Sequence, residues 1–389
     1  MSAAVISLNP DLKRLQDEGY ELEIREGCAI VYHVPYLDST CTVQYATLVS
    51  TLAMNGTAVR IPDTHVMYMQ GSVPYHKAGS RMDAVYNSPC KKVFSGISVD
   101  SMLSNKPQGG YKDYYQKFTA YIQALSAEAQ AVDPTVTAAT FKRIVSSDDS
   151  VLCYADTNSS RGAIMDTTDK FKGQRVGIVG LGGTGSYLLD QISKTPVAEI
   201  HLFDGDAFCQ HNAFRAPGAP SIEVFGEQPY KTDYFKGIYS NMHRGIYSHP
   251  YKLDEDNVSE LGSLDFVFLA MDSGICKQTI VDFLLNQKIS FIDTGININR
   301  AGDSLIGMAR ITVSHEGDRQ AIEKYVSFDE VEPDLYQTNI QTADLNAFCA
   351  LSAVMQWKKS LGFYKEDIHF DNCVYTTNDG EFNHGSDDI

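Results

Sequence analysis

Residues 175–190 read Arg-Val-Gly-Ile-Val-Gly-Leu-Gly-Gly-Thr-Gly-Ser-Tyr-Leu-Leu-Asp, and this stretch decides the fold. The apolar run Val176–Val179 predicts a buried strand, the glycines predict a tight turn, and the residues after them predict a helix. A second run, Glu199–Phe203, predicts another strand that ends at Asp204. A strand, a glycine turn, a helix and a second strand with an acidic end are together typical of a nucleotide-binding α/β sheet.

The glycines of the turn have separate tasks. Gly180 permits the tight turn, Gly182 lets the backbone approach a phosphate closely, and Gly185 lets the helix pack on the sheet. Gly183 belongs to the same phosphate-binding turn. A phosphate would lie at the N-terminus of the helix, where unpaired N–H groups and the helix dipole favour an anion. Asp204, 19 positions after Gly185, would accept hydrogen bonds from the ribose hydroxyls.

The residues beyond Asp204 indicate which nucleotide chemistry the turn serves. The diphosphate of a dehydrogenase cofactor needs little positive charge beyond the helix N-terminus, whereas a reactive triphosphate needs more. Arg215 offers a planar fork and Lys231 a mobile charge for oxygens that gain charge as pyrophosphate departs. Asp272, at the carboxyl end of a later strand, would hold Mg²⁺ directly or through water. No acid or base suited to hydride transfer is evident, so a dehydrogenase is disfavoured.

The organisation of the chain changes near residue 150. Residues 1–150 predict an α+β domain, with short strands and one helix at 21–25, 29–34, 65–69 and 113–130. Residues 151–377 predict a Rossmann-like doubly wound α/β domain, with strands and a late helix at 176–179, 199–203, 266–270, 291–293 and 340–360. The tail, 378–389, is rich in Asn, Asp and Gly, which predicts disorder.

Composition excludes several classes of partner. The formal net charge of −17 over 389 residues argues against nucleic acid and against an anionic membrane surface. The eight cysteines are scattered and form no Cys-x-x-Cys pair, so no zinc is expected and a reduced, cytoplasmic protein is the simplest interpretation. We see neither a signal pattern nor an apolar run of the roughly 18 residues that a membrane span needs.

The combined pattern resembles the ThiF and ubiquitin-activating-enzyme superfamily over roughly residues 155–365. Gly-Leu-Gly-Gly-x-Gly, Asp-x-Asp, Asn-x-x-Arg, a Lys after Gly-x-x-Pro and a strand-end Asp occur in this order in that superfamily. The resemblance implies a ThiF-type adenylation domain over residues 151–377. It also implies ATP-dependent adenylation of the C-terminal carboxylate of a ubiquitin-like protein, with Mg²⁺, release of pyrophosphate and formation of an acyl-adenylate.

The resemblance also implies roles for the matching residues. It assigns the ribose to Asp204, the metal to Asp272, and the phosphates to Asn212, Arg215 and Lys231, with Asp206 beside them. Family members often take an arginine from the partner subunit, and Ser159-Ser-Arg-Gly-Ala-Ile164 resembles that segment. Arg161 is therefore the candidate arginine supplied in trans within a homodimer. A surface salt bridge for Arg161, solvated surface charges for Arg215 and Lys231, and a turn cap for Asp206 remain open. His211 is interpreted as a wall of the site.

The acceptor of the activated carboxyl group is less clear from the sequence. Related conjugation enzymes carry a nucleophilic cysteine in a region that corresponds to Gly317–Thr342, which contains none here. Cys349 lies in the apolar helix and is expected in the core, and Cys276 is also expected to pack, although it opens a helix. Three routes stay open: a thiol of a conjugating carrier enzyme, a sulfur donor, or an ester on Ser327, Tyr336 or Thr338.

Other functions also remain open. The second hypothesis is adenylation of a peptide, a small carboxylate or a sulfur-carrier protein. A third, a non-catalytic scaffold partner that keeps the nucleotide fold, is disfavoured because the set of phosphate-binding residues is complete. The segments Val34-Pro-Tyr36 and Val73-Pro-Tyr75 resemble a domain of bacterial activating enzymes that act in ubiquitin-like pathways. This suggests that the N-terminal domain binds the modifier or recruits a carrier, and a stabilising appendage or dimer arm is the alternative.

Overall fold

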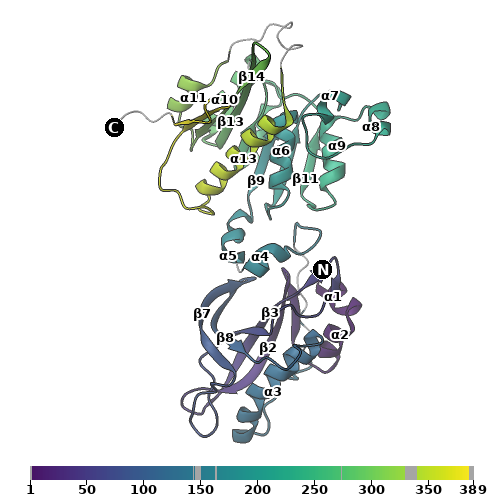
Figure 1. The fold of residues 1–389 in the computed structure, drawn as a ribbon, viewed down its shortest axis with the longest axis vertical. Coiled ribbons are helices and arrows are strands. Elements are labelled where there is room, and N and C mark those ends of the chain that lie inside the picture. Colours follow the sequence, from purple (N-terminus) through teal and green to yellow (C-terminus); the bar gives the residue numbers. More distant parts are fainter. Residues whose placement is uncertain are drawn as a thin grey trace. The chain divides into compact units, whose positions relative to one another are not determined.

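The computed structural model describes residues 2–142, 144, 150–162, 164–272, 274–328 and 340–384. They form two compact units, Met1–Asp169 and Lys170–Ile389, each with its own sheet and core (Figure 1). Residues 151–169, expected at the start of the second domain, belong to the first unit. The reason is contact: α4 (Thr157–Gly162) touches strand β3, and α5 (Met165–Thr168) touches strand β7.

The first unit is an antiparallel sheet covered by helices. Its six strands lie in the order β1-β2-β3-β6-β8-β7. Their bounds are β1 (Leu22–Arg25), β2 (Cys28–Leu37), β3 (Val43–Thr51), β6 (Val66–Gln70), β7 (Tyr86–Phe94) and β8 (Ile97–Ser104), and β4 (Met54–Asn55) pairs with β5 (Ala58–Val59). The helices are α1 (Ser2–Leu8), α2 (Pro10–Asp17) and α3 (Tyr114–Val132).

The core of this unit lies between the sheet and α3. Asp113 caps α3 by accepting a hydrogen bond from the backbone N–H of Gln116 at 2.7 Å. Phe118, Ile122 and Leu125, which recur at helical spacing, are buried against β2 and its neighbours. The predicted α+β character of this part of the chain, with its short strands and single long helix, is confirmed.

The second unit is a mixed sheet of eight strands in the order β11-β10-β9-β12-β13-β14-β15-β16. The pairings from β11 to β13 are parallel and those from β13 to β16 are antiparallel. The strands are β9 (Arg175–Val179), β10 (Glu199–Phe203), β11 (Ile246–His249), β12 (Phe266–Leu269), β13 (Ser290–Ala301), β14 (Ser304–Ser314), β15 (Asn372–Thr376) and β16 (Phe382–His384). The helices are η1 (Asp169–Phe171), at the junction of the units, α6 (Gly183–Ile192), α7 (Gln210–Ala213), α8 (Ile222–Glu227), α9 (Lys231–Tyr239), η2 (Val258–Ser263), α10 (Ile275–Gln287), α11 (Gln320–Tyr325) and α13 (Ala343–Ser360).

Both faces of this sheet are buried, as a doubly wound fold requires. On β12, Phe266 and Phe268 face a core shared with α6 and α13, whereas Val267 and Leu269 face a core shared with α10. Figure 1 shows α6 and α13 lying together on one face, and these two helices are in contact. The predicted Rossmann-like architecture is confirmed.

The end of the described chain differs from the expectation of a disordered tail. Phe382–His384 form β16, which pairs with β15. The physical reason is aromatic packing: the ring of Phe382 lies 5.1 Å from that of Tyr375 and 5.9 Å from that of Phe348. The ring of His384 also packs, 4.6 Å from that of Phe370, and polar composition alone does not reveal these ring contacts. Residues 385–389 lie outside the described part of the chain.

A buried ionic triad fixes the strand ends next to α10. Asp293 is fully buried, and its carboxylate lies 2.6 Å from Nζ of Lys277 and 2.6 Å from a guanidinium nitrogen of Arg310. Asp293 pairs in register with Leu269, the last residue of β12, whose carbonyl accepts a hydrogen bond from the hydroxyl of Thr294. The triad therefore ties the start of α10 to β13 and β14, immediately beside the carboxyl end of β12.

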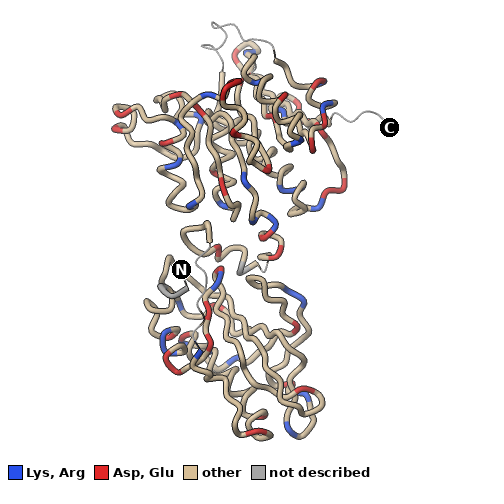
Figure 2. Tube along the Cα trace, turned by 180° about the vertical axis from the view of Figure 1, so that it is seen from behind, with Lys and Arg blue, Asp and Glu red and all other residues tan. Residues whose placement is uncertain are grey.

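No helix among the described residues combines the length and the apolar character that crossing a bilayer demands. Figure 2 shows acidic and basic residues interspersed along the chain in both units.

Replacing Asp293 by Ala tests the triad. Lys277 and Arg310 would lose their shared carboxylate while remaining buried, so we expect the free energy of unfolding of the second unit to fall by about 3–5 kcal/mol. Urea titration followed by the emission of Trp357 measures this, because Trp357 is the only tryptophan of the chain and is fully buried in that unit. The control, Lys194→Ala, breaks an exposed pair with Asp190 and should cost less than about 1 kcal/mol. Equal stability of the two variants would contradict a stabilising role for the triad.

Candidate active site

Three parallel strands bring the predicted site residues to one edge of the second sheet. Val179 pairs in register with Phe203 of β10 and with Leu269 of β12, so β9, β10 and β12 end at the same level. Backbone hydrogen bonds continue just beyond these ends, from Gly180 N to the Phe203 carbonyl and from Ala270 N to the Val179 carbonyl, both at 2.8 Å. The glycine turn, Asp204 and the segment leading to Asp272 therefore emerge side by side.

Steric contacts explain why Gly180 and Gly185, which pack against neighbouring backbone, have no side chain. Gly180 has φ +88°, and a Cβ there would lie 2.4 Å from the carbonyl oxygen of Ala270. A Cβ on Gly185 would lie 1.8 Å from the carbonyl oxygen of Gly180. Gly182 differs, because a Cβ there would meet no atom within 4 Å. The turn is thus packed against the sheet on one side and open at Gly182, the position predicted to leave room for a phosphate.

Asn346 holds the start of α6 from the neighbouring helix α13, and sequence reasoning missed it. Its side chain is buried, its Oδ1 accepts a hydrogen bond from the hydroxyl of Thr184 at 2.8 Å, and its Nδ2 donates to the Thr342 carbonyl at 2.9 Å. It also fills the space beside Gly183, where a Cβ would lie 2.3 Å from the amide group. The sequence feature that could have revealed Asn346 is its position next to Leu345, within the apolar pattern of the late helix.

Asp204 joins the glycine turn to the second strand. Its side chain is only 8% exposed, and its two oxygens accept hydrogen bonds from Leu181 N at 2.7 Å and from Asp206 N at 2.9 Å. Nζ of Lys231 lies 3.4 Å from both oxygens. A carboxylate has about four lone-pair positions, so these bonds leave acceptor capacity for a further donor such as a ribose hydroxyl.

Lys231 is not a solvated surface charge, since its side chain is only 9% exposed. Its ammonium group lies 2.8 Å from Oδ2 of Asp206 as well as beside Asp204. Burial opposes ionisation of Asp206, but the hydrogen bond and charge of Lys231, with help from Lys252, outweigh it and lower the pKa of that carboxyl group. The carboxylate of Asp206 is therefore occupied by ion pairs in this structure.

Two buried donors point to an anion at this edge. Nδ2 of Asn212 and Nε of Arg215 are buried, and neither has a hydrogen-bond partner within the described residues. Burying a donor without an acceptor is costly, so both groups favour an incoming acceptor. His211 is largely exposed; the desolvation that it undergoes lowers its pKa, and the nearby charges of Arg215 and Lys231 lower it further. The two unpartnered donors and the guanidinium charge of Arg215 fit a phosphate chain.

Asp272 and Arg161 are placed less fully. Asp272 is exposed and lies between β12 and Gly274, which precedes α10, and no contact made by its carboxylate is described. Its position agrees with the predicted strand end, and its role toward Mg²⁺ stays a prediction. Arg161 lies in α4 of the first unit, but its side chain is outside the described residues.

The cysteines divide by exposure. Cys349 is fully buried, and burial raises the pKa of its thiol to about 12, which confirms that it is a core residue. Cys276 is exposed in the first turn of α10, so the expectation that it packs was wrong. It shares the helical face of Ile280 and Leu284, which follow at intervals of four residues, but it is exposed and does not join their core. Of the hydroxyl candidates Ser327 is described, whereas Tyr336 and Thr338 lie outside the described residues.

The comparisons with known proteins can now be set beside this geometry. The model of the ThiF family matches residues 154–361, which is more than half of the chain. The chain belongs to the ThiF family. Residues 10–157 of this ThiF-family chain match a second model, described as a domain of unknown function, DUF6791. The second unit therefore has the fold of ThiF-type adenylyltransferases.

Solved structures similar to this ThiF-family chain include E. coli MccB with ATP, with 15% identity over 59% of this chain and 71% of that one and a TM-score of 0.47. MccB with N-formylated MccA has 18% identity over 58% and 68%, with a TM-score of 0.44. PaaA has 15% identity over 83% and 96%, with a TM-score of 0.45. No curated protein matches the chain.

Two glycine substitutions separate packing from ligand access. Gly185→Ala forces a Cβ against a carbonyl oxygen, so we expect a loss of stability of about 1–3 kcal/mol. Gly182→Ala adds a methyl group to open space, so it should unfold like the wild type but bind ATP about tenfold more weakly. Calorimetric ATP titration and Trp357 emission measure the two effects. Gly226→Ala, also in open space but in α8, is the control. Unchanged ATP affinity of Gly182→Ala would contradict a phosphate position beside this glycine.

Proposed function

We propose that this protein adenylates the C-terminal carboxylate of a ubiquitin-like protein, using ATP and Mg²⁺ and releasing pyrophosphate. The observation that carries the proposal is the pair of buried, unpartnered donors on Asn212 and Arg215, at the sheet edge that also presents the open glycine turn. These groups complement the charge of a triphosphate better than that of a diphosphate cofactor. Membership of the ThiF family supports an adenylyltransferase type of enzyme.

Each residue of the site would contribute position or charge. The N-terminus of α6 and the open space at Gly182 would receive phosphate oxygens, and Asp204 would accept from the ribose. Arg215 and Lys231 would stabilise the negative charge that develops as pyrophosphate leaves. Mg²⁺, held by Asp272, would supply further neutralisation of the phosphates. The attacking carboxylate is ionised at neutral pH, so the reaction needs no histidine base and His211 can serve as a wall.

We propose further that the activated carboxyl group passes to the thiol of a carrier enzyme or to another acceptor. The burial of Cys349 and its raised thiol pKa argue against that residue as the acceptor. A thiol must ionise to act as a nucleophile, and a group buried in apolar surroundings does so poorly. A sulfur donor and the ester route through Ser327, Tyr336 or Thr338 are alternatives that product analysis distinguishes.

Exchange of labelled pyrophosphate into ATP tests the proposed function. The full-length protein with Mg²⁺ should show exchange that depends on an added ubiquitin-like protein ending in Gly. Arg215→Gln and Asp272→Asn should each lower the exchange rate by about a hundredfold, because each removes charge stabilisation of the departing pyrophosphate. Arg319→Gln is the matched control, since this arginine is exposed and pairs with Asp282 and Asn286.

Each other outcome has a defined meaning. Exchange that depends on a peptide, a small carboxylate or a sulfur-carrier protein would keep adenylation and replace the proposed substrate. ATP binding with no exchange for any carboxylate would favour a scaffold partner and would contradict the proposal. Hydroxylamine sensitivity of the labelled product distinguishes a thioester from an ester.

The proposal includes a homodimer in which Arg161 of one copy reaches the triphosphate bound by the other. Coexpression of Arg161→Gln and Arg215→Gln chains tests this arrangement. Only a mixed dimer would contain one complete site, so exchange should recover to roughly a quarter of the wild-type rate. If Arg161 serves its own chain, no dimer contains a complete site and no activity returns. A monomer in sedimentation would also contradict this part of the proposal.

A further inference from the structure

Two histidines and an aspartate gather at the opposite edge of the second sheet. His315 follows the last residue of β14, and Asp371 precedes the first residue of β15. Because β14 is antiparallel to β13, its end pairs with Phe291 near the start of β13, away from the edge that carries the glycine turn. This cluster, completed by His369 and called the His-His-Asp cluster below, therefore lies outside the candidate active site.

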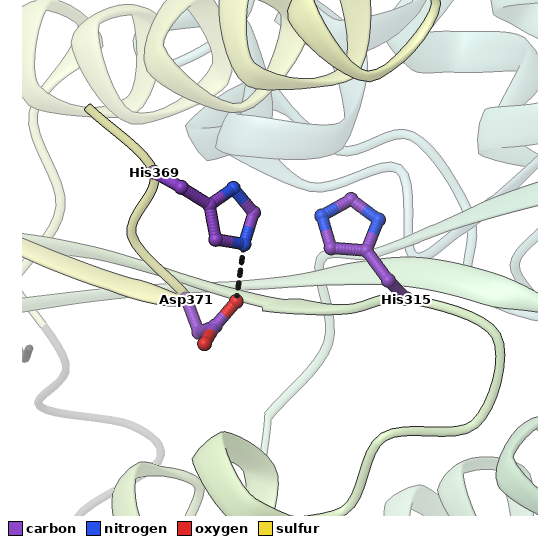
Figure 3. Close-up of side chains that lie close together, drawn as sticks. All are labelled: His315, His369 and Asp371. Carbon is purple, nitrogen blue, oxygen red and sulfur yellow. Dashed lines mark hydrogen bonds and ion pairs between the residues drawn. The ribbon is translucent and has the colours of Figure 1, made fainter. Parts of the chain in front are cut away.

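The ligand atoms of the His-His-Asp cluster converge. One side-chain nitrogen or oxygen from each of the three residues lies within 4.8 Å of the others. Nε2 of His369 is 3.0 Å from Oδ1 of Asp371, and the rings of His315 and His369 have centroids 5.4 Å apart. Figure 3 shows the two rings side by side, with the carboxylate of Asp371 next to the ring of His369. His315 comes from a different part of the chain than His369 and Asp371, which are two residues apart, and the three side chains converge.

The spacing is close to that of a first coordination sphere. Ligand bonds of about 2.0–2.1 Å in a tetrahedral zinc site place neighbouring ligand atoms about 3.3 Å apart. The pair formed by His369 and Asp371 already satisfies this separation. The ring of His315 would have to approach by about 1.5 Å or less, a displacement that side-chain rotation can supply.

Two further observations indicate a ligand rather than a self-contained contact. Nε2 of His315 is buried and has no hydrogen-bond partner within the described chain. Nδ1 of His369 faces Oε2 of Glu366 at 3.4 Å, and Glu366 is itself held by Nε2 of Gln356 at 3.0 Å. A carboxylate on the outer nitrogen of a histidine orients the ring and leaves the other nitrogen for a metal ion.

We propose that His315, His369 and Asp371 bind a Zn²⁺ ion, with water in the fourth position. Two imidazoles and one carboxylate suit a transition metal such as zinc, whereas Mg²⁺ and Ca²⁺ prefer oxygen ligands. The ion would replace the proton shared between His369 and Asp371, and Nε2 of His315, which has no partner among the described residues, would coordinate it. It would link the end of β14 to the segment that enters β15. The expectation of no zinc rested on the absence of paired cysteines, a criterion that does not address histidines brought together by the fold.

Zinc titration of the full-length protein tests the proposal. After removal of any oligohistidine tag and of bound metal by a chelator, calorimetric titration with ZnCl₂ alone should give one site per chain with a micromolar or lower Kd. Saturating Zn²⁺ should raise the Tm of the second unit, followed by Trp357 emission, by about 5 °C, because binding favours the folded state. The His315→Ala and Asp371→Asn variants should each weaken binding at least tenfold.

Matched variants control for surface binding and for misfolding. His76→Ala removes a histidine of the first unit that also faces a carboxylate, that of Glu128, and Asp367→Asn removes an exposed carboxylate close in sequence to the cluster. Both should bind Zn²⁺ like the wild type. His315→Gln keeps a polar side chain, so it provides a folded variant if His315→Ala loses the wild-type Trp357 emission. Absence of a one-to-one site, or equal affinity of the His315 variants and the controls, would overturn the proposal.

Discussion

The buried carboxylate of Asp204 is the point on which the architecture of the active-site edge depends. It accepts hydrogen bonds from two backbone N–H groups, that of Leu181 in the glycine turn and that of Asp206 beyond the second strand. A negative charge with so little access to water requires a counterion, and Lys231 supplies it from the first turn of α9. Removing either Asp204 or Lys231 would leave the other buried without its counterion, and removing Asp204 would also leave the N–H of Leu181 without its acceptor. The glycine turn, the end of the second strand and α9 are therefore held together by one set of electrostatic contacts.

A second buried acid, Asp293, lies three strands further along the sheet, in β13. Its single carboxylate pairs with both Lys277 and Arg310 within the protein interior and so anchors the beginning of α10. The loop that carries Asp272 is consequently attached at both ends to fixed elements, β12 before it and α10 after it. Asp204 thus lies beside the glycine turn, and Asp293 lies beside the carboxyl end of β12.

The sequence predicted the local features because each depends on residues close together in the chain. The strand before Gly180, the turn, the helix after it and the acidic strand end at Asp204 could all be recognised from spacing alone. The contact of Asn346 with Thr184 could not, because 162 positions separate the two side chains. The same holds for Lys277 with Asp293, and for His315 with His369. Cys276 was misjudged because a first helical turn can face either the core or water, and nearby apolar residues do not determine which.

The contrast between the packed and the open sides of the glycine turn bears on how binding energy is used. Gly180 and Gly185 interlock with backbone carbonyl groups, so this part of the turn has almost no alternative position. A nucleotide that enters beside Gly182 would meet N–H groups already held in their final orientation. Little conformational entropy would then be lost in the backbone on binding, and reorganisation would fall on side chains such as Arg215. In the proposed complex the turn would be a preorganised receptor, because its glycines allow the backbone to pack closely.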